Sequence, residues 1–428
     1  MKPCFTLIFL PLLLLAATGQ VFLCAAAPAD AAVAPAAAAN DSAAIATPGS
    51  EPEPDRLAHD FVRVSVLVAD PGQEIYQIVG HAAIRMECPF YGLDNVFSFE
   101  TDNRGGWVGQ FVGEANGRFI RMSTAEWLEQ YRADGRGVAG YELNLTPEQK
   151  LVLWRNLDIS AEALAEERFN VRRRHCLAAC VGELELALRP DTIAVTSAVT
   201  RLDNGHEINR TMSPFSKWVA LIYMNVTAAD CDKTDHWTTR AMPVSFADYF
   251  ATAEIVDADG SRRSMLTGST DRLVEARPRA ATGGPTPMAW AWGVVALAAM
   301  LSAAAFSGRG RRIAAPVCVA LMVMQTLLAL LLAFLAFMPN RIGAHWNWLF
   351  VPVNPLPLIL WLSWRRHRQH RLGLALMVLG AVDLIFAAVA MPVTSQITPE
   401  TALLSVALGL PLLAWGMAMR RGGRHVNR

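Results

Sequence analysis

The sequence predicts two structural parts: an exported α+β domain, and an all-α bundle of five transmembrane helices that follows it. The chain of 428 residues is 53% hydrophobic, which is too apolar for an ordinary soluble protein and too long for one domain. The apolar excess is confined to residues 5–26 and 289–419, so the stretch between them has the composition of a globular domain. The formal net charge of +0 gives no reason to expect a nucleic-acid partner.

Residues 1–26 have the pattern of a secretory signal peptide. Lys2 precedes an apolar run, and small residues after Cys24 offer a cleavage site. Residues 27–55 are rich in alanine and proline and have few large side chains to bury, which predicts a disordered tether. The folded exported domain is then expected at 56–280 and the membrane part at 281–428.

The exported domain is predicted to form strands first and helices later, an order typical of the α+β class. Apolar and polar positions alternate over Phe61–Ala69, and two further extended segments are expected at Ile75–Met86 and Asn95–Thr101. A helix is predicted to begin at Pro147, with Thr146 as its N-cap. Another is predicted over Cys176–Leu188.

Five apolar segments follow Pro287, each near the length that crosses a hydrocarbon layer of about 30 Å. They lie at about 289–306, 313–338, 348–364, 372–391 and 401–419. Arginines cluster after the first, third and fifth segments, and these loops are expected in the cytoplasm by the positive-inside rule. The α+β domain is therefore expected outside, in agreement with the signal peptide.

Two features of the membrane part have more than one interpretation. The loop Pro339–Trp348 contains the polar and aromatic residues His345, Trp346, Asn347 and Trp348. These either form an interfacial aromatic belt or contact a lipid headgroup beneath the exported domain. Asp383 lies inside an apolar segment, where a carboxyl group is either functional or packed against a polar partner.

A histidine and a cysteine are the strongest candidates for chemistry. Cys176 is at a predicted helix start, where the helix dipole, free N–H groups and neighbouring basic residues lower a thiol pKa. His81 is on a predicted strand and could serve as its base. Each also has an ordinary explanation: His81 as a packed or surface histidine, and Cys176 as one of four exported cysteines available for disulfides. The other three are Cys88, Cys180 and Cys231.

Several motifs resemble the Lnb-type proteins, a family of bacterial lipoprotein N-acyltransferases. Asp70–Tyr76, Gly80–Arg85 and Val96–Phe99 resemble the opening of the periplasmic domain of that family. Cys176–Ala178 falls where the family has an Asn-Cys-Ala-Thr motif, with His175 in place of the asparagine and Ala179 in place of the threonine. The hydrophobic tail with Trp346–Trp348 also fits.

The resemblance implies a permuted papain-like fold of the NlpC/P60 type, in which the histidine strand precedes the cysteine helix. It implies Cys176 as nucleophile and His81 as general base, with no metal or cofactor. It also implies a phospholipid acyl donor, a lipoprotein acceptor and a place in the bacterial inner membrane. Ser98 is the expected residue that orients His81, with Glu100 as its rival. The backbone N–H groups of Cys176 and Leu177 are expected to stabilise an oxyanion.

Two other functions remain open at this point. A membrane-anchored cysteine amidase or peptidase of the cell envelope would use the same pair of residues. A non-catalytic envelope protein would instead have Cys176 in a disulfide with Cys180 or another cysteine. The sequence has no His spacing typical of a metal site, and no Walker, Rossmann or Gly-x-Ser-x-Gly motif.

Overall fold

The structure is a computed structural model of the chain. It describes residues 62–72, 77, 79–102, 115–163, 165–195, 238, 241–277, 287–337, 347–365, 368–394 and 397–423. The expected signal peptide and tether lie outside the described residues, as do Cys231, His345 and Trp346.

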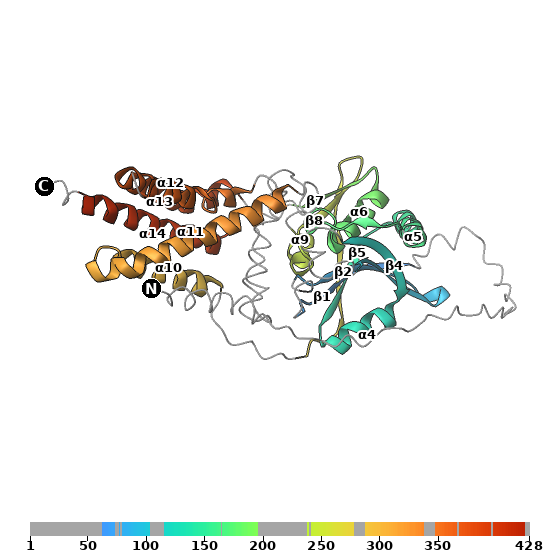
Figure 1. Cartoon of the computed structure of the whole chain (residues 1–428). Coiled ribbons are helices and arrows are strands. Elements are labelled where there is room, and N and C mark those ends of the chain that lie inside the picture. The colour runs from blue at the N-terminus through green and yellow to red at the C-terminus, as the bar shows by residue number, and fades with distance from the viewer. Residues whose placement is uncertain are drawn as a thin grey trace, which may run out of the picture. The chain divides into compact units, whose positions relative to one another are not determined.

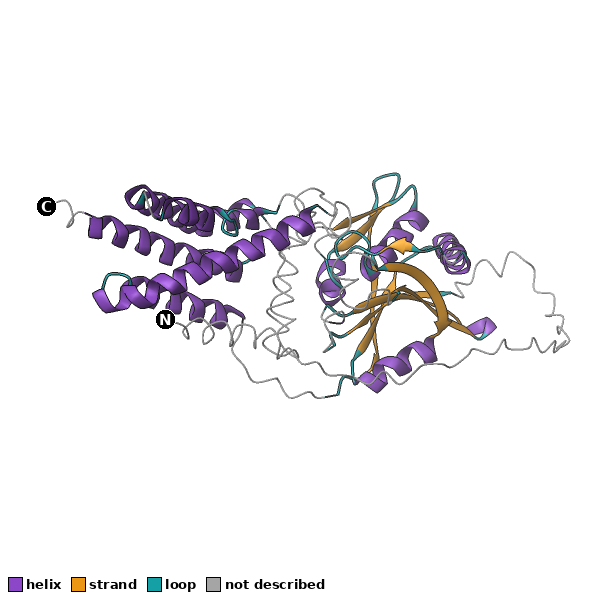
Figure 2. Ribbon diagram, viewed as in Figure 1, coloured by secondary structure: helices purple, strands orange, loops and turns teal. Residues whose placement is uncertain are grey.

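The N-terminal part is built on a seven-stranded antiparallel sheet (Figure 2). In spatial order its strands are β10 (Leu266–Val274), β5 (Val138–Leu143), β1 (Arg63–Ala69), β2 (His81–Cys88), β3 (Leu93–Thr101), β4 (Asn116–Ser123) and β6 (Glu167–Arg168). A second sheet consists of β7 (Thr192–Val195), β8 (Ala253–Val256) and β9 (Arg262–Ser264). The helices are α4 (Thr124–Asp134), α5 (Pro147–Glu162), α6 (Cys176–Leu188) and α9 (Phe246–Phe250), with 3₁₀ turns η2 (Pro89–Tyr91) and η5 (Pro243–Ser245). The α+β prediction is confirmed, although strands β7 to β10 return after the helices.

The two faces of the large sheet carry separate hydrophobic cores. Helices α5 and α6 cover one face and α4 covers the other (Figure 1). Phe97 and Phe99 of β3 pack toward α5 and α6, while Val96 packs toward Trp127 of α4. This alternation is the period-2 pattern expected of a strand buried on both faces.

Local signals set the helix starts. Thr146 accepts from the backbone N–H of Gln149, whose side chain bonds back to Thr146, so α5 begins with the predicted cap. Helix α6 spans the predicted Cys176–Leu188. Strand β2, by contrast, begins only at His81, six residues after the predicted start at Ile75, because Gly80 turns the chain with φ +80°.

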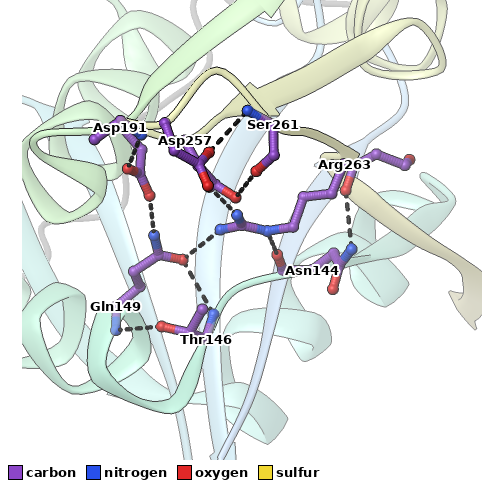
Figure 3. A network of polar contacts seen from close by, with 10 residues as sticks. Asn144, Thr146, Gln149, Asp191, Asp257, Ser261 and Arg263 are labelled. Carbon is purple, nitrogen blue, oxygen red and sulfur yellow. Dashed lines mark hydrogen bonds and ion pairs between the residues drawn. The ribbon is translucent and has the colours of Figure 1, made fainter.

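A network of hydrogen bonds and ion pairs connects the second sheet to the start of α5 (Figure 3). The guanidinium of Arg263 on β9 forms an ion pair with Asp257 and donates to Gln149 Oε1 at 2.9 Å. Gln149 Nε2 in turn donates to Asp191 Oδ2 at 2.9 Å, just before β7. Because this network joins segments more than a hundred residues apart, no local sequence pattern predicts it.

The C-terminal part contains five helices among its described residues, as the sequence predicts. They are α10 (Pro287–Ala304), α11 (Gly308–Ala336), α12 (Leu356–Trp364), α13 (Gln369–Val393) and α14 (Pro399–Gly423). Two buried clusters contain side chains of α11, α13 and α14, so these three helices share a core.

The prediction of five membrane spans is wrong by the criterion of helix length. Three described helices, α11, α13 and α14, are long and apolar enough to cross a membrane. The predicted span at 348–364 is interrupted, because Pro352 and Pro355 lack an N–H donor and the Asn354 side chain bonds to the nearby backbone. Only the nine residues of α12 remain helical there. Gln325 of α11 donates to the Pro352 carbonyl at 2.5 Å, which satisfies one backbone acceptor of this irregular segment.

Glycines bring α13 and α14 into close antiparallel contact. A Cβ atom at Gly380 would lie 2.5 Å from the Gly409 carbonyl oxygen, and one at Gly409 would lie 2.7 Å from the Gly380 carbonyl oxygen. Small residues at such a helix interface let the backbones approach closely within a bilayer. Asp383 lies beside Gly409 and is 2% exposed, and its Oδ2 atom has no hydrogen-bond partner among the described residues. Its position at the helix contact is compatible with the packed interpretation, but no described residue is the expected polar partner of Oδ2.

Candidate active site

His81 is the first residue of β2, and a glycine fixes where that strand begins. Gly80 has φ +80°, and a Cβ atom there would lie 2.5 Å from the Ala69 carbonyl oxygen. Both facts exclude larger residues. The N–H of Val244 in η5 donates a hydrogen bond to the carbonyl oxygen of Val79 at 2.9 Å. This bond holds the backbone just before Gly80 against η5. His81 therefore has a defined backbone position.

Two side chains of β3 bind the same nitrogen of His81. The Nε2 atom lies 2.8 Å from Ser98 Oγ and 3.1 Å from Glu100 Oε1. Ser98 donates its single hydroxyl proton to Glu100 Oε1 at 2.6 Å, so its oxygen can only accept from His81. Nε2 must therefore carry a proton, and Nδ1 is the nitrogen left for the thiol. Ser98 and its rival Glu100 act together on His81.

Cys176 is the first residue of α6. The N-cap residue, His175, makes no side-chain capping bond, and the first intrahelical bond runs from Ala179 N–H to the His175 carbonyl at 2.8 Å. Helix geometry leaves the N–H groups of Cys176 and Leu177 without intrahelical acceptors. They are donors at the positive end of the helix dipole, beside the sulfur.

The structure brings Cys176 and His81 together, across 95 positions of the sequence. Burial alone raises the pKa of the Cys176 thiol, but the charge of His81 and hydrogen bonds with His175 and His81 outweigh burial and bring that pKa to about 5. Burial alone lowers the pKa of His81, but electrostatic interactions with Tyr131, Glu100 and Cys176 outweigh it, so the pKa lies well above 6.5. A thiolate and an imidazolium are therefore the stable forms near neutral pH.

Glu100 supplies the negative charge behind the imidazole. Burial alone raises the pKa of its carboxyl, but the charge of His81 and hydrogen bonds from His81 and Ser98 lower it to about 2. The carboxylate thus stays ionised at any pH at which the protein would work. It holds His81 in one tautomer and stabilises its cation.

One wall of the site was not expected from the sequence. The ring centroid of Trp127 on α4 lies 6.3 Å from that of His81 and 4.3 Å from that of Tyr131. The Arg136 guanidinium lies over the Tyr131 ring, with its Cζ atom 4.8 Å from the centroid. The i, i+4 spacing of Trp127 and Tyr131 could have indicated a buried helix face. No local signal, however, places that face against His81.

The other expected site residues have mixed outcomes. Cys88, Cys176 and Cys180 are free thiols, while Cys231 lies outside the described residues. The Cys180 Sγ atom lies 3.8 Å from the Ala82 carbonyl oxygen, and burial raises the pKa of this thiol. Of the aromatic loop, Asn347 accepts from Leu349 N–H at 2.9 Å and so caps η6 (Trp348–Phe350). That bond gives Asn347 a structural role.

No group of three or more His, Cys, Asp or Glu residues that could hold a metal ion occurs in the described part of the chain. The chemistry that the described groups can perform is nucleophilic. A thiolate lies beside an oriented imidazolium and the start of a helix, which are the parts needed to form a covalent acyl intermediate.

Comparison with known proteins identifies the two parts of the chain separately. Residues 55–191 match the Lnb N-terminal periplasmic domain, and residues 279–420 match the Lnb transmembrane domain. The chain belongs to the Lnb family. It is thus a membrane protein with a periplasmic N-terminal domain, and Lnb membership is consistent with an enzyme of lipoprotein maturation. No curated protein and no solved structure matches the chain.

The Lnb periplasmic match contains His81, Ser98, Glu100 and Cys176. Thr238, whose carbonyl oxygen lies 3.3 Å from His175 Nε2, falls after that match. The surroundings of the sulfur are thus completed by a later segment of the same chain.

Proposed function

We propose that this chain is a membrane-anchored periplasmic thiol acyltransferase. It moves an acyl chain from a phospholipid, through a thioester on Cys176, to the N-terminal amine of a bacterial lipoprotein. The observation that carries the proposal is the placement of Cys176 at a helix start beside His81, which Ser98 and Glu100 orient, in a chain with Lnb domains. The order of histidine strand before cysteine helix also supports a permuted papain-like arrangement.

In the first half-reaction, the Cys176 thiolate attacks the ester carbonyl carbon of the phospholipid. The N–H groups of Cys176 and Leu177 stabilise the oxyanion that forms. The carbon–oxygen bond of the ester then breaks as His81 gives its proton to the leaving lysophospholipid oxygen. Cys176 is left as an acyl thioester and His81 as a neutral imidazole.

In the second half-reaction, the amine of the lipoprotein attacks the thioester carbon. Neutral His81 takes a proton from the amine, and the carbon–sulfur bond breaks as the amide forms. The thiolate and imidazolium are restored, so protons and charges balance over the cycle. The membrane helices confine the site to the bilayer that holds both substrates, which lowers the entropic cost of their encounter.

A cysteine amidase or peptidase of the envelope is the second candidate, because the same thiolate and imidazolium also cleave amides. The non-catalytic alternative required Cys176 in a disulfide, and the free thiols of Cys176 and Cys180 argue against it.

The test is complementation of a bacterial strain that lacks lipoprotein N-acylation. The wild-type chain should add a third acyl chain to a reporter lipoprotein, read by mass spectrometry of its N-terminus. Cys176→Ser and His81→Ala should each lower this product at least about 100-fold, since each removes a group that takes part in bond making or proton transfer.

Cys88→Ala is the matched control, because Cys88 is another free thiol of the same domain, buried and at the opposite end of β2 from His81. It should retain most of the product. If the wild-type chain adds no third acyl chain although it is present in the membrane, the acyltransferase assignment is wrong. Cleavage of envelope peptides that depends on Cys176 would then favour the second candidate.

A further inference from the structure

Both polar contacts that β3 makes with His81 meet at one nitrogen atom. Ser98 Oγ lies 2.8 Å and Glu100 Oε1 lies 3.1 Å from the Nε2 atom of the imidazole. Contacts at a single atom fix one point of a ring but leave the ring able to swing about that point. Catalysis needs a narrower placement, because a shift of about 1 Å in a reacting group can slow a reaction about 100-fold.

A tryptophan of α4 lies next to the imidazole. The ring centroids of Trp127 and His81 are 6.3 Å apart, and the two ring planes are inclined by 34°. Trp127 is 1% exposed, and its Nε1 atom has no hydrogen-bond partner among the described residues. A buried N–H without an acceptor lowers stability, so a hydrogen bond does not explain a tryptophan here. What this side chain offers His81 is the surface of its ring.

Two further side chains keep the indole in place. The Tyr131 ring lies one helical turn further along α4, with its centroid 4.3 Å from that of Trp127. The Arg136 Cζ atom lies 4.8 Å from the Tyr131 centroid. A continuous row of contacts thus runs from His81 through Trp127 and Tyr131 to Arg136. Because Trp127 is packed between two other rings in a buried cluster, it has little room to change its rotamer.

The backbone fixes the end of α4 relative to His81. Just beyond the helix, the Gly137 carbonyl oxygen accepts from the Asp70 N–H at 2.9 Å. The Asp70 carbonyl oxygen in turn accepts from Arg136 Nε at 2.7 Å. Asp70 follows Ala69, which is the last residue of β1 and the register partner of His81. The end of α4 and the start of β2 are therefore anchored to the same short segment.

We propose that Trp127 is a positioning residue for His81. Its indole blocks the swing of the imidazole about Nε2 and so keeps the opposite edge of that ring directed at Cys176. Ser98 and Glu100 select the nitrogen that carries the proton, and Trp127 sets the plane of the ring. Without the indole, the imidazole moves away from the sulfur, and the thiolate loses the positive charge beside it.

This inference rests on the proposed function, because it takes Cys176 as the nucleophile that His81 serves. The placement of the two has a geometric basis in α6. Cys180 lies one helical turn after Cys176, and its Sγ atom is 3.8 Å from the carbonyl oxygen of Ala82, the residue that follows His81. The first turn of α6 therefore packs against the start of β2.

The test measures the reactivity of the Cys176 thiol, which requires no acyl substrate. The full-length protein in detergent is alkylated with iodoacetamide between pH 4 and pH 10, and modification of Cys176 is followed by peptide mass mapping. Trp127→Leu should raise the midpoint of this pH profile by at least about one unit, which is about tenfold less thiolate at pH values below both midpoints. Trp127→Phe lacks the N–H but keeps an aromatic ring, and should raise the midpoint less.

Leu128→Ala is the matched control. Leu128 is the next residue of α4 and is buried in the same hydrophobic cluster as Trp127, but it is not part of the row of rings. Its truncation should lower the melting temperature and leave the midpoint of Cys176 alkylation unchanged. If Leu128→Ala raises that midpoint as much as Trp127→Leu does, loss of packing explains both results and the positioning role is wrong.

A double-mutant cycle separates an effect through His81 from damage elsewhere. Trp127→Leu should raise the midpoint in the chain that has His81. In a chain that already carries His81→Ala, the same change should have no effect, because no imidazole remains to be positioned. An equal rise in both chains would overturn the proposal.

Cys180 reports misfolding, because it is fully buried and should stay unmodified in every folded chain. If Cys180 reacts in Trp127→Leu, then Trp127→Phe replaces that variant in the cycle and the same comparison decides. The result is independent of the complementation test. A rise that depends on His81, without lipoprotein acylation by the wild type, would support the positioning role and reject the acyltransferase. Acylation by the wild type without such a rise would reject the positioning role alone.

Discussion

At the scale of the residue, the site shows a competition between burial and charge. Burial opposes ionisation of both Cys176 and His81, yet each is more stable charged, because each offers the other an opposite charge at close range. The thiolate exists above about pH 5, where the lowered pKa of Cys176 lies. The imidazolium exists below the raised pKa of His81. The reactive pair is therefore present between these two limits and is lost on either side.

Glu100→Gln should narrow the pH range in which the Cys176 thiolate and the His81 imidazolium exist together. The change removes the negative charge that stabilises the His81 cation, so the pKa of His81 should fall and that of Cys176 should rise. Acyl transfer at neutral pH should drop about 10- to 100-fold, in the range expected for impaired acid–base catalysis. The pH profile of acyl transfer should lose its alkaline side first.

The control for this variant is Glu87→Gln. Glu87 lies on β2 near the end opposite His81, and pairs with Arg85 at 3.5 Å. The Glu87→Gln variant should leave the pH profile of acyl transfer unchanged. An unchanged profile in Glu100→Gln as well would mean that Ser98 alone orients His81.

The sequence could propose Cys176 and His81 as a pair, because a helix start and a strand are local features and the Lnb resemblance selects this cysteine among four. It could also name Ser98 and Glu100, since the strand period puts them on one face. It could not choose between those two, because the choice depends on how far each side chain lies from His81 Nε2. Trp127 and Tyr131 were missed, because the contact of α4 with His81 joins segments far apart in the chain.

At the scale of the element, two helix starts were predicted correctly: that of α5, which has the expected Thr146 cap, and that of α6, which has no side-chain cap. Helices α5 and α6 begin at the expected residues, Pro147 and Cys176. The start of β2 was predicted poorly, because apolar residues before Gly80 continue the strand pattern while the glycine turns the backbone. That turn is what sets His81 at the end of its strand.

Gly80→Ala should therefore damage both stability and function. An alanine at φ +80° with its Cβ 2.5 Å from the Ala69 carbonyl oxygen must shift the backbone before His81. The free energy of unfolding should fall by about 1–3 kcal/mol. Alkylation of Cys176 at pH 7 should slow, because a displaced His81 stabilises the thiolate less. Thermal melting of the full-length protein and the alkylation rate provide the two measurements.

Gly260→Ala is the control that separates backbone strain from displacement of the site. Gly260 has φ +87° but a Cβ there would contact nothing within 4 Å. Gly260→Ala should lower the free energy of unfolding by about 1 kcal/mol, the cost of the left-handed conformation alone. Cys176 should react as in the wild type. Equal alkylation rates in both variants would show that the Gly80 turn does not position His81.

At the scale of the whole molecule, hydropathy predicted a membrane part but overcounted the spans. Apolar composition alone does not distinguish a continuous helix from one interrupted by Pro352 and Pro355. The arginines at the end of α14, rather than hydropathy, predict the orientation of that helix. Helix α14 ends with Arg420 and Arg421 in its last turn and has Glu400 in its first turn. The arginine end is expected in the cytoplasm.

The C-terminus should therefore be cytoplasmic, and the number of spans leads to the same expectation. A chain that starts with a periplasmic domain and crosses with α11, α13 and α14 ends on the cytoplasmic side, as for any odd number of crossings. Green fluorescent protein fused after Arg428 should fluoresce, and alkaline phosphatase fused there should be inactive. Phosphatase inserted after Thr394, between α13 and α14, should be active because that loop faces the opposite side. Active phosphatase at the C-terminus would mean an even number of crossings. In that case either one of the three long helices does not span, or α10, with 18 residues at about 1.5 Å each, crosses without α12.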